Sequence, residues 1–202
     1  MRVYCDLDGT LIRGDLEREF VGYLQSTGSF TIRNYLLALI SIPANKLRRK
    51  QERGSIYKSW TVGFTAEEKD RLFSDFLENE TEKLEIRADV LGLLEEYKSS
   101  GSQIILMTGS YRELVLAFLK KKHMVNIFDE VIACEVKENG FCVSQHPYGK
   151  DKCLFLKKDM PLIGIANEYA DRFYLDQCSV AYVVGKDEKL KRIADEKKWR
   201  CL

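Results

Sequence analysis

The sequence predicts an α/β protein, a three-layer, doubly wound parallel sheet with a helical block inserted near its start. Short apolar runs rich in β-branched residues, typical of buried parallel strands, alternate with segments of helical spacing. One stretch near the N-terminus departs from this alternation and shows helical patterns only. The five predicted strands are Val3–Cys5, Ile104–Met107, Val131–Ala133, Leu162–Ile165 and Val180–Val184.

Helices are predicted between and after these strands, because their apolar residues recur every three or four positions. A helix over Asp89–Ser99 leads the chain into the second strand, and a hairpin turn containing Gly140 is predicted over Lys137–Phe141. The other predicted helices of the alternating region are Glu113–Lys122, Lys152–Lys158, Tyr169–Gln177 and Glu188–Lys198.

The inserted block, residues 13–84, contains no convincing strand. Thr65 and Glu68 form a capping box at the start of its last helix, where each would satisfy a free backbone N–H group. We therefore predict an α/β core formed by residues 1–12 and 85–202, with residues 13–84 as a helical cap over the carboxyl edge of the sheet. The block's predicted segments are helices Leu16–Ser26, Ile32–Ile42 and Glu67–Glu82 and a basic turn at Lys46–Arg53.

Composition gives no sign of a nucleic-acid or membrane partner. Lys and Arg number 32 and Asp and Glu 31, so no global field favours an anionic polymer or surface. The longest apolar stretch, Tyr35–Ile42, is too short to span a bilayer. The six cysteines show neither a CxxC pair nor metal-ligand spacing with His, which favours buried, reduced thiols. The N-terminus lacks an apolar signal core, so we expect a cytoplasmic location.

Two carboxylates two residues apart, Asp6 and Asp8, follow the first predicted strand at once in the segment CDLDGT. Ligands of open α/β sheets bind beyond the carboxyl ends of the strands. There, an ionised carboxylate could attack phosphorus while the other protonates the leaving oxygen and later deprotonates water. Gly9 would allow a tight backbone that turns N–H groups toward phosphate. The alternative is a plain surface turn, since Asp and Gly are turn residues.

A second polar segment, Thr108-Gly109-Ser110, follows the strand Ile104–Met107. Ser110 and Glu113 have the spacing of a capping box at the start of the next helix. A hydroxyl and backbone N–H groups at a helix N-terminus suit phosphate, although Ser and Thr also cap helices for purely structural reasons.

A third polar segment, Asn167 to Asp171, follows the strand Leu162–Ile165 and offers oxygen ligands suited to magnesium. Asn167 as a helix cap and Asp171 as a surface residue are the alternative. Between the second and third segments, Lys150 and Lys152 both compete for the role of a lysine that neutralises phosphate charge.

The order of these segments resembles the four motifs of the haloacid dehalogenase superfamily. They are the DLDGT segment at Asp6, then Thr108, then Gly149-x-x-Lys152, then Asn167-x-x-x-Asp171. The helical insertion after the first motif is similar to the cap of the phosphoserine phosphatase-like branch. The resemblance covers nearly the whole chain and implies a Rossmann-like core and a magnesium-dependent phosphohydrolase.

The resemblance also implies a role for each motif residue. Asp6 is the nucleophile and a metal ligand, and Asp8 is the general acid/base that lends its backbone carbonyl to the metal. Thr108 and Gly109 bind phosphoryl oxygens. Lys152, preferred over Lys150 because of the Gly-x-x-Lys spacing, stabilises the charge on Asp6 and the phosphoryl group.

One metal position departs from the family pattern, because Asn167 stands where an acidic residue is usual. An amide oxygen still coordinates Mg²⁺, but without formal charge, so weaker metal affinity is expected. Asp171 is expected to act through a hydrogen bond to a ligand or, as the alternative, to bind the metal directly.

The substrate expected from the sequence is a small phosphorylated metabolite. Asp15 lies where the branch places an acidic specificity residue, and an N-cap of the following helix is the equal alternative. Two other functions remain open: a phosphotransferase of the same fold, and a metal-poor, non-catalytic domain that binds phosphate. His123 and His146 fit no triad or metal spacing and are interpreted as structural.

Overall fold

The computed structural model describes residues 1–32, 34, 36, 39, 60–61, 64–80, 82, 84–136 and 143–202. The predicted basic turn at Lys46–Arg53 and the hairpin turn at Lys137–Phe141 lie outside these residues. Of the predicted helix Ile32–Ile42, the structure describes Ile32, Asn34, Leu36 and Leu39, and all four are helical.

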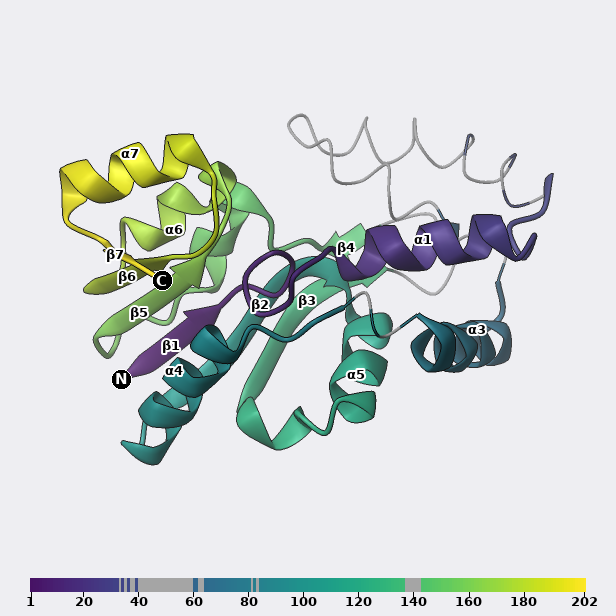
Figure 1. Ribbon diagram of the computed structural model, residues 1–202, viewed down its shortest axis with the longest axis horizontal. Coiled ribbons are helices and arrows are strands. Elements are labelled where there is room, and N and C mark those ends of the chain that lie inside the picture. The colour runs from purple at the N-terminus through teal and green to yellow at the C-terminus, as the bar shows by residue number, and fades with distance from the viewer. Residues whose placement is uncertain are drawn as a thin grey trace.

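A seven-stranded sheet in the order β4-β3-β2-β1-β5-β6-β7 forms the centre of the fold (Figure 1). All neighbouring strands are parallel except β4, which pairs antiparallel with β3. The five predicted strands are confirmed, and β4 and β7 are short additions at the two edges. The strands are β1 (Arg2–Cys5), β2 (Gln103–Tyr111), β3 (Glu130–Val136), β4 (Val143–Gln145), β5 (Leu162–Ala166), β6 (Val180–Val183) and β7 (Arg200–Cys201).

Strand β1 lies at the middle of the sheet, and all four of its residues are buried, as expected of a parallel strand covered on both faces. Arg2 pairs with Gln103 of β2 on one side and with Leu162 of β5 on the other. The carboxyl ends of β1, β2 and β5 therefore meet at one edge of the sheet. This register brings together the three polar segments that the sequence placed after separate strands.

Alternate residues of the five predicted strands face two separate hydrophobic cores, which makes the fold three-layered. Val3 and Leu106 pack in the core that includes helices α4 (Ala88–Ser99) and α5 (Arg112–Lys121). Tyr4 and Ile105 pack in the other core, against α6 (Arg172–Leu175) and α7 (Glu188–Lys197). The predicted doubly wound architecture is confirmed.

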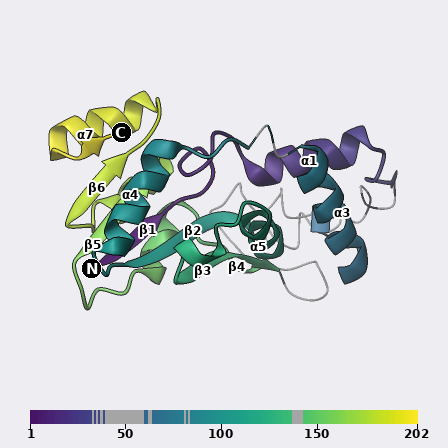
Figure 2. The same cartoon turned by 60° about the horizontal axis from the view of Figure 1, so that its bottom comes forward.

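Helices α1 (Leu16–Ser26) and α3 (Ala66–Asn79) lie side by side beyond the carboxyl ends of the central strands (Figures 1 and 2). Phe20 of α1 packs edge-on against Phe73 of α3, with ring centroids 5.1 Å apart. Trp60 joins them and also contacts Tyr111, at the end of β2, with a centroid distance of 5.3 Å. The predicted capping box of Thr65 and Glu68 is present. A buried aromatic cluster thus attaches these helices to the core.

Two predicted helices differ in the structure because inward-facing charged residues interrupt them. The prediction of a helix over Lys152–Lys158 is wrong: a 3-10 helix, η4 (Gly149–Phe155), turns the buried Lys152 inward. The predicted helix Tyr169–Gln177 is broken into the 3-10 turn η5 (Tyr169–Asp171) and the short α6. Asp171 is buried at this junction and points toward Lys152.

Another 3-10 helix, η3 (Val125–Ile127), precedes β3. Within the described part of the chain, no helix has the length and apolar character needed to cross a membrane.

Candidate active site

Asp6 lies one residue beyond β1 and is buried, with Lys152 as its partner. Lys152 Nζ donates to Asp6 Oδ1 at 2.8 Å and also lies 2.8 Å from Asp171 Oδ1. Burial lowers the pKa of Lys152, but the two carboxylates outweigh it and hold the pKa above its usual value. The ammonium is therefore charged and bridges the first and fourth motifs.

The structure places Lys152, and not Lys150, beside Asp6 and Asp171. Lys152 is 2% exposed. Lys150 is exposed and lies over the Phe173 ring, with its Nζ 6.0 Å from the ring centroid. The 3-10 conformation of η4 explains the difference, because it directs residues two positions apart to different sides.

Thr10 links Asp6 to Asn167, a contact that the sequence analysis did not foresee. The buried Thr10 Oγ1 lies 3.1 Å from Asp6 Oδ2 and 2.9 Å from Asn167 Oδ1. The single hydroxyl hydrogen of Thr10 is thus shared between two acceptors, Asp6 Oδ2 and Asn167 Oδ1, which keeps both oxygens close to the Thr10 hydroxyl. Thr10 belongs to the quoted DLDGT segment, but its role required knowing that β1 and β5 are neighbours.

Gly9 forms the tight turn that the sequence predicts. Its φ is +70°, which favours glycine, and a Cβ there would lie 2.0 Å from Asn167 Nδ2, so a side chain would have to displace the Asn167 amide. Its own N–H donates to Gly14 O at 2.8 Å. Gly9 therefore shapes the loop, and its predicted part in phosphate binding stays a prediction.

Asp8 is held by hydrogen bonds from two elements. Leu16 N, in the first turn of α1, donates to Oδ1 at 2.8 Å. The hydroxyls of Thr108 and Ser110, at the end of β2, donate to Oδ2 at 3.1 and 2.6 Å. Burial, with the nearby charges of Asp15 and Asp6, raises the pKa of Asp8 to about 7, although the Ser110 and Leu16 hydrogen bonds lower it. A carboxyl group with this pKa is suited to general acid/base chemistry at neutral pH.

The predicted capping box of Ser110 and Glu113 is wrong. Strand β2 continues through Tyr111, which becomes the N-cap of α5 without a side-chain capping bond. Glu113 accepts a hydrogen bond from Tyr111 Oη at 2.7 Å instead. Ser110 is consequently part of the strand end, and its hydroxyl is directed to Asp8.

The remaining predicted residues lie around this centre. Thr108 is fully buried, and its Oγ1 also accepts from Ser110 N at 3.0 Å, while Gly109 is partly exposed between them. Asp15 accepts from Arg18 N at 2.8 Å, so it is the N-cap of α1. His146 is buried and stacked on Tyr148. The proposed contact of Asp15 with substrate stays a prediction.

The charge of the site fits a divalent cation. Burial, against the opposing effect of Lys152, raises the pKa of Asp171 to about 7. Asp6 and Asp171 share the one buried Lys152 ammonium, whereas the donors that hold Asp8 are uncharged, so the site can accommodate further positive charge. Among the described residues no three His, Cys, Asp or Glu side chains form a metal-holding group, so a metal here would also need the Asn167 amide and a backbone carbonyl. This oxygen-only set suits Mg²⁺.

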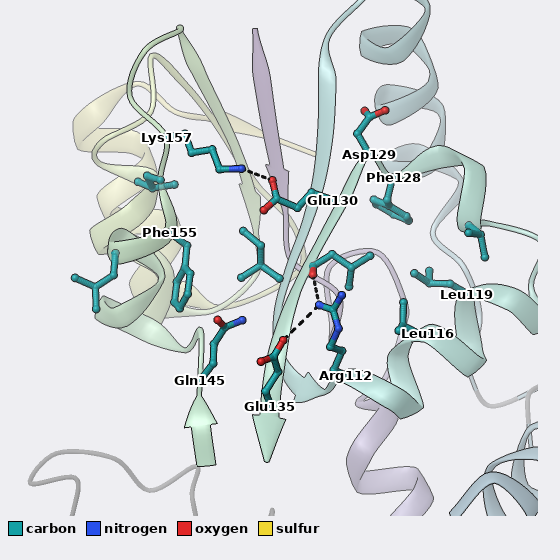
Figure 3. Close-up of a pocket in the computed structure, with 15 residues that line it drawn as sticks. Arg112, Leu116, Leu119, Phe128, Asp129, Glu130, Glu135, Gln145, Phe155 and Lys157 are labelled. Atoms are coloured by element: carbon teal, nitrogen blue, oxygen red, sulfur yellow. Dashed lines mark hydrogen bonds and ion pairs between the residues drawn. The ribbon is translucent and has the colours of Figure 1, made fainter. Parts of the chain in front are cut away.

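A pocket of about 680 Å³ lies elsewhere, along β3 between α5 and η4 (Figure 3). Arg112 lines the pocket and donates a hydrogen bond to Val131 O of β3 at 2.6 Å. Lys157 and Glu130 also line the pocket and form an ion pair. None of the predicted site residues lines this pocket, so the candidate site is the cluster at the carboxyl ends of β1, β2 and β5.

The family of this chain follows from a comparison with known protein families. The family model for haloacid dehalogenase-like hydrolase matches residues 3–174. The chain belongs to this family. The match extends from β1 through α6 and so includes all four predicted motifs of this haloacid dehalogenase-like hydrolase.

Solved structures share the fold of this haloacid dehalogenase-like hydrolase at low identity. A protein of unknown function from Bordetella pertussis Tohama I is 12% identical, with a TM-score of 0.78 over 100% of this chain and 97% of that chain. An apo phosphoserine phosphatase is 13% identical, with a TM-score of 0.63 over 100% and 92%. A phosphoserine phosphatase with a phospho-aspartyl intermediate analogue is 15% identical, with a TM-score of 0.60 over 100% and 92%. The fold is therefore that of the phosphoserine phosphatase-like branch, as predicted. A search among curated proteins gives no match.

Proposed function

We propose that this hydrolase is a magnesium-dependent phosphatase that cleaves a small phosphomonoester through an aspartyl-phosphate on Asp6. The observation that carries the proposal is the division of the two carboxyl groups of the DLDGT segment. Asp6 accepts from the Lys152 ammonium at 2.8 Å, whereas Asp8 is held separately by Leu16, Thr108 and Ser110. Paired catalytic carboxyl groups take different roles when their surroundings separate their pKa values.

In the first step, a carboxylate oxygen of Asp6 attacks phosphorus, and the bond from phosphorus to the leaving oxygen breaks as Asp8 protonates that oxygen. Asp8, now a carboxylate, accepts a proton from water, and the water oxygen attacks phosphorus. Inorganic phosphate leaves and Asp6 is regenerated. Lys152 offsets negative charge on Asp6 and the phosphoryl group through both steps.

The Asp6 carboxylate, the Asn167 amide oxygen and the Asp8 backbone carbonyl would hold the magnesium ion. When bound, Mg²⁺ supplies positive charge that offsets the charge on the phosphoryl oxygens. Asp171 Oδ1 lies 2.8 Å from Lys152 Nζ, so Asp171 acts by holding the Lys152 ammonium and not as a direct ligand of the magnesium ion. A solved phosphoserine phosphatase with a phospho-aspartyl intermediate analogue supports this chemistry for the fold, at 15% identity.

Residues 13–84 are proposed to be the cap that closes the site and selects the substrate. The hydrogen bond from Leu16 N to Asp8 Oδ1 supports this role, because it ties the first turn of α1 to the acid/base group. Asp15, next to it, would contact a polar group of the leaving alcohol.

The decisive test is phosphate release from p-nitrophenyl phosphate with magnesium and with EDTA. The native chain is compared with Asp6→Asn and with the matched control Asp195→Asn, which alters an exposed carboxylate on α7. Magnesium-dependent release that only Asp6→Asn abolishes supports the proposal. Release by Asp6→Asn above a mock preparation contradicts the mechanism, and no release by the native chain favours a non-catalytic phosphate-binding domain.

A further inference from the structure

Ser110 occupies a position that helix capping does not explain. The residue is 4% exposed and lies at the point where β2 ends. The following residue, Tyr111, is the N-cap of α5 and uses no side-chain capping bond. Ser110 Oγ donates instead to Asp8 Oδ2 at 2.6 Å. This is the shortest of the three hydrogen bonds that the described residues make to the Asp8 carboxyl group.

Resting on the phosphatase function proposed above, we propose that Ser110 is a positioning residue for Asp8, which orients the carboxyl group for proton transfer to the leaving oxygen. Leu16 N fixes Oδ1 from the side of α1, and the Ser110 and Thr108 hydroxyls fix Oδ2 from β2. These donors on opposite oxygens set the rotation of the carboxyl plane. Hydrogen bonds weaken as they lengthen, so the 2.6 Å contact has the largest part in this orientation.

Backbone geometry supports a dedicated role for the hydroxyl. Thr108 Oγ1 accepts from Ser110 N at 3.0 Å while donating to Asp8, so both hydroxyls and the amide form one connected set. The register between β2 and β3 shifts between Met107 and Tyr111, which is the stretch that contains Ser110. Irregular strand ends of this kind redirect side chains toward a site.

The role predicts a dependence on the leaving group. In the first step the phosphorus–oxygen bond breaks and the proton of Asp8 passes to the leaving oxygen. p-Nitrophenolate is weakly basic and leaves without that proton, whereas phenolate needs it more. A misplaced acid therefore slows cleavage of phenyl phosphate and spares p-nitrophenyl phosphate. The two substrates have nearly the same shape, so a general loss of structure would affect both.

The experiment measures kcat/KM for both substrates with magnesium, in the native chain, Ser110→Ala and Ser110→Thr. We expect Ser110→Ala to lower kcat/KM for phenyl phosphate about tenfold or more, within the range of general acid catalysis, and for p-nitrophenyl phosphate less than about threefold. Ser110→Thr restores the hydroxyl and should recover phenyl phosphate turnover.

The matched control is Ser102→Ala. Ser102 is 6% exposed and directly precedes β2, and its Oγ has no hydrogen-bond partner among the described residues. It should leave both substrates unchanged, and thermal unfolding checks each variant for folding. If Ser110→Ala lowers kcat/KM equally for both substrates, or for neither, the positioning role is overturned. The phosphatase function still stands in that case if the native chain turns over either substrate. Absence of native turnover with either substrate overturns both proposals.

Discussion

Gly9 and Asn167 pack so closely that a Cβ on Gly9 would lie 2.0 Å from Asn167 Nδ2. The turn after β1 and the segment after β5 are 158 positions apart in the sequence (167 − 9), yet their contact leaves no room for a methyl group. The contact also keeps Asn167 Oδ1 2.9 Å from Thr10 Oγ1 and thus beside Asp6. The fit of these two residues therefore sets the geometry of the proposed magnesium site.

Gly9→Ala should raise the magnesium concentration needed for half-maximal activity, because the new methyl group displaces Asn167. It should also lower the free energy of unfolding by about 1–3 kcal/mol through backbone strain and the clash. Gly28→Ala is the matched control, since Gly28 has a φ of +67° but nothing within 4 Å of its Cβ position. Magnesium titration and urea unfolding measure the two effects. An unchanged magnesium requirement in Gly9→Ala would exclude Asn167 from the metal site.

Asn167→Asp should lower the magnesium concentration needed for half-maximal activity, because a charged oxygen replaces an amide oxygen. In EDTA the same change should lower the melting temperature, since it adds a charge to a site where carboxylates already outnumber the ammonium. Asn126→Asp, at an exposed position in η3, is the control. Magnesium should raise the melting temperature of Asn167→Asp more than that of the native chain. An equal or smaller rise would contradict Asn167 as a magnesium ligand.

Lys152→Met should destabilise the protein by about 3–5 kcal/mol, because it leaves the buried carboxyl groups of Asp6 and Asp171 without their common partner. Turnover should be lost as well, since the charge opposite the phosphoryl group is removed. The same substitution at the exposed Lys150 should change the free energy of unfolding by less than about 0.5 kcal/mol. Urea unfolding compares the two variants. Equal stabilities would show that the buried ammonium is not needed to hold the two carboxyl groups.

The pKa of Asp8, raised from 3.8 to about 7, predicts the pH dependence of stability without metal. A carboxyl group with a raised folded-state pKa binds more protons in the folded chain than in the unfolded one. Its contribution to stability is therefore full below pH 3.8 and is lost as the pH rises through about 7. Asp8→Asn should reduce this loss of stability between pH 5 and pH 7.5, measured by urea unfolding in EDTA. Asp195→Asn should leave it unchanged.

Local pattern was sufficient to predict the central strands and the motif segments. Apolar runs such as Val3–Cys5 are buried on both faces of a parallel sheet, and few other structures accommodate them. The capping box at Thr65 was also predictable, because its two partners are three residues apart. Boundaries were less predictable at η4 and η5, where the inward orientation of Lys152 and Asp171 overrides helical spacing.

The fold class, the family resemblance and the candidates Asp6, Asp8, Thr108 and Asn167 were all predictable from sequence, because each candidate follows a strand whose pattern is local. The spacing of the third motif favoured Lys152 over Lys150, but the contact of Lys152 with Asp6 and the direction of the Ser110 hydroxyl toward Asp8 became visible in the folded chain. These contacts depend on which strands are neighbours and on where β2 ends. The physical reason is that a buried charge or hydroxyl takes the partner that lies within hydrogen-bond distance in the folded chain, and that distance is unrelated to separation in the sequence.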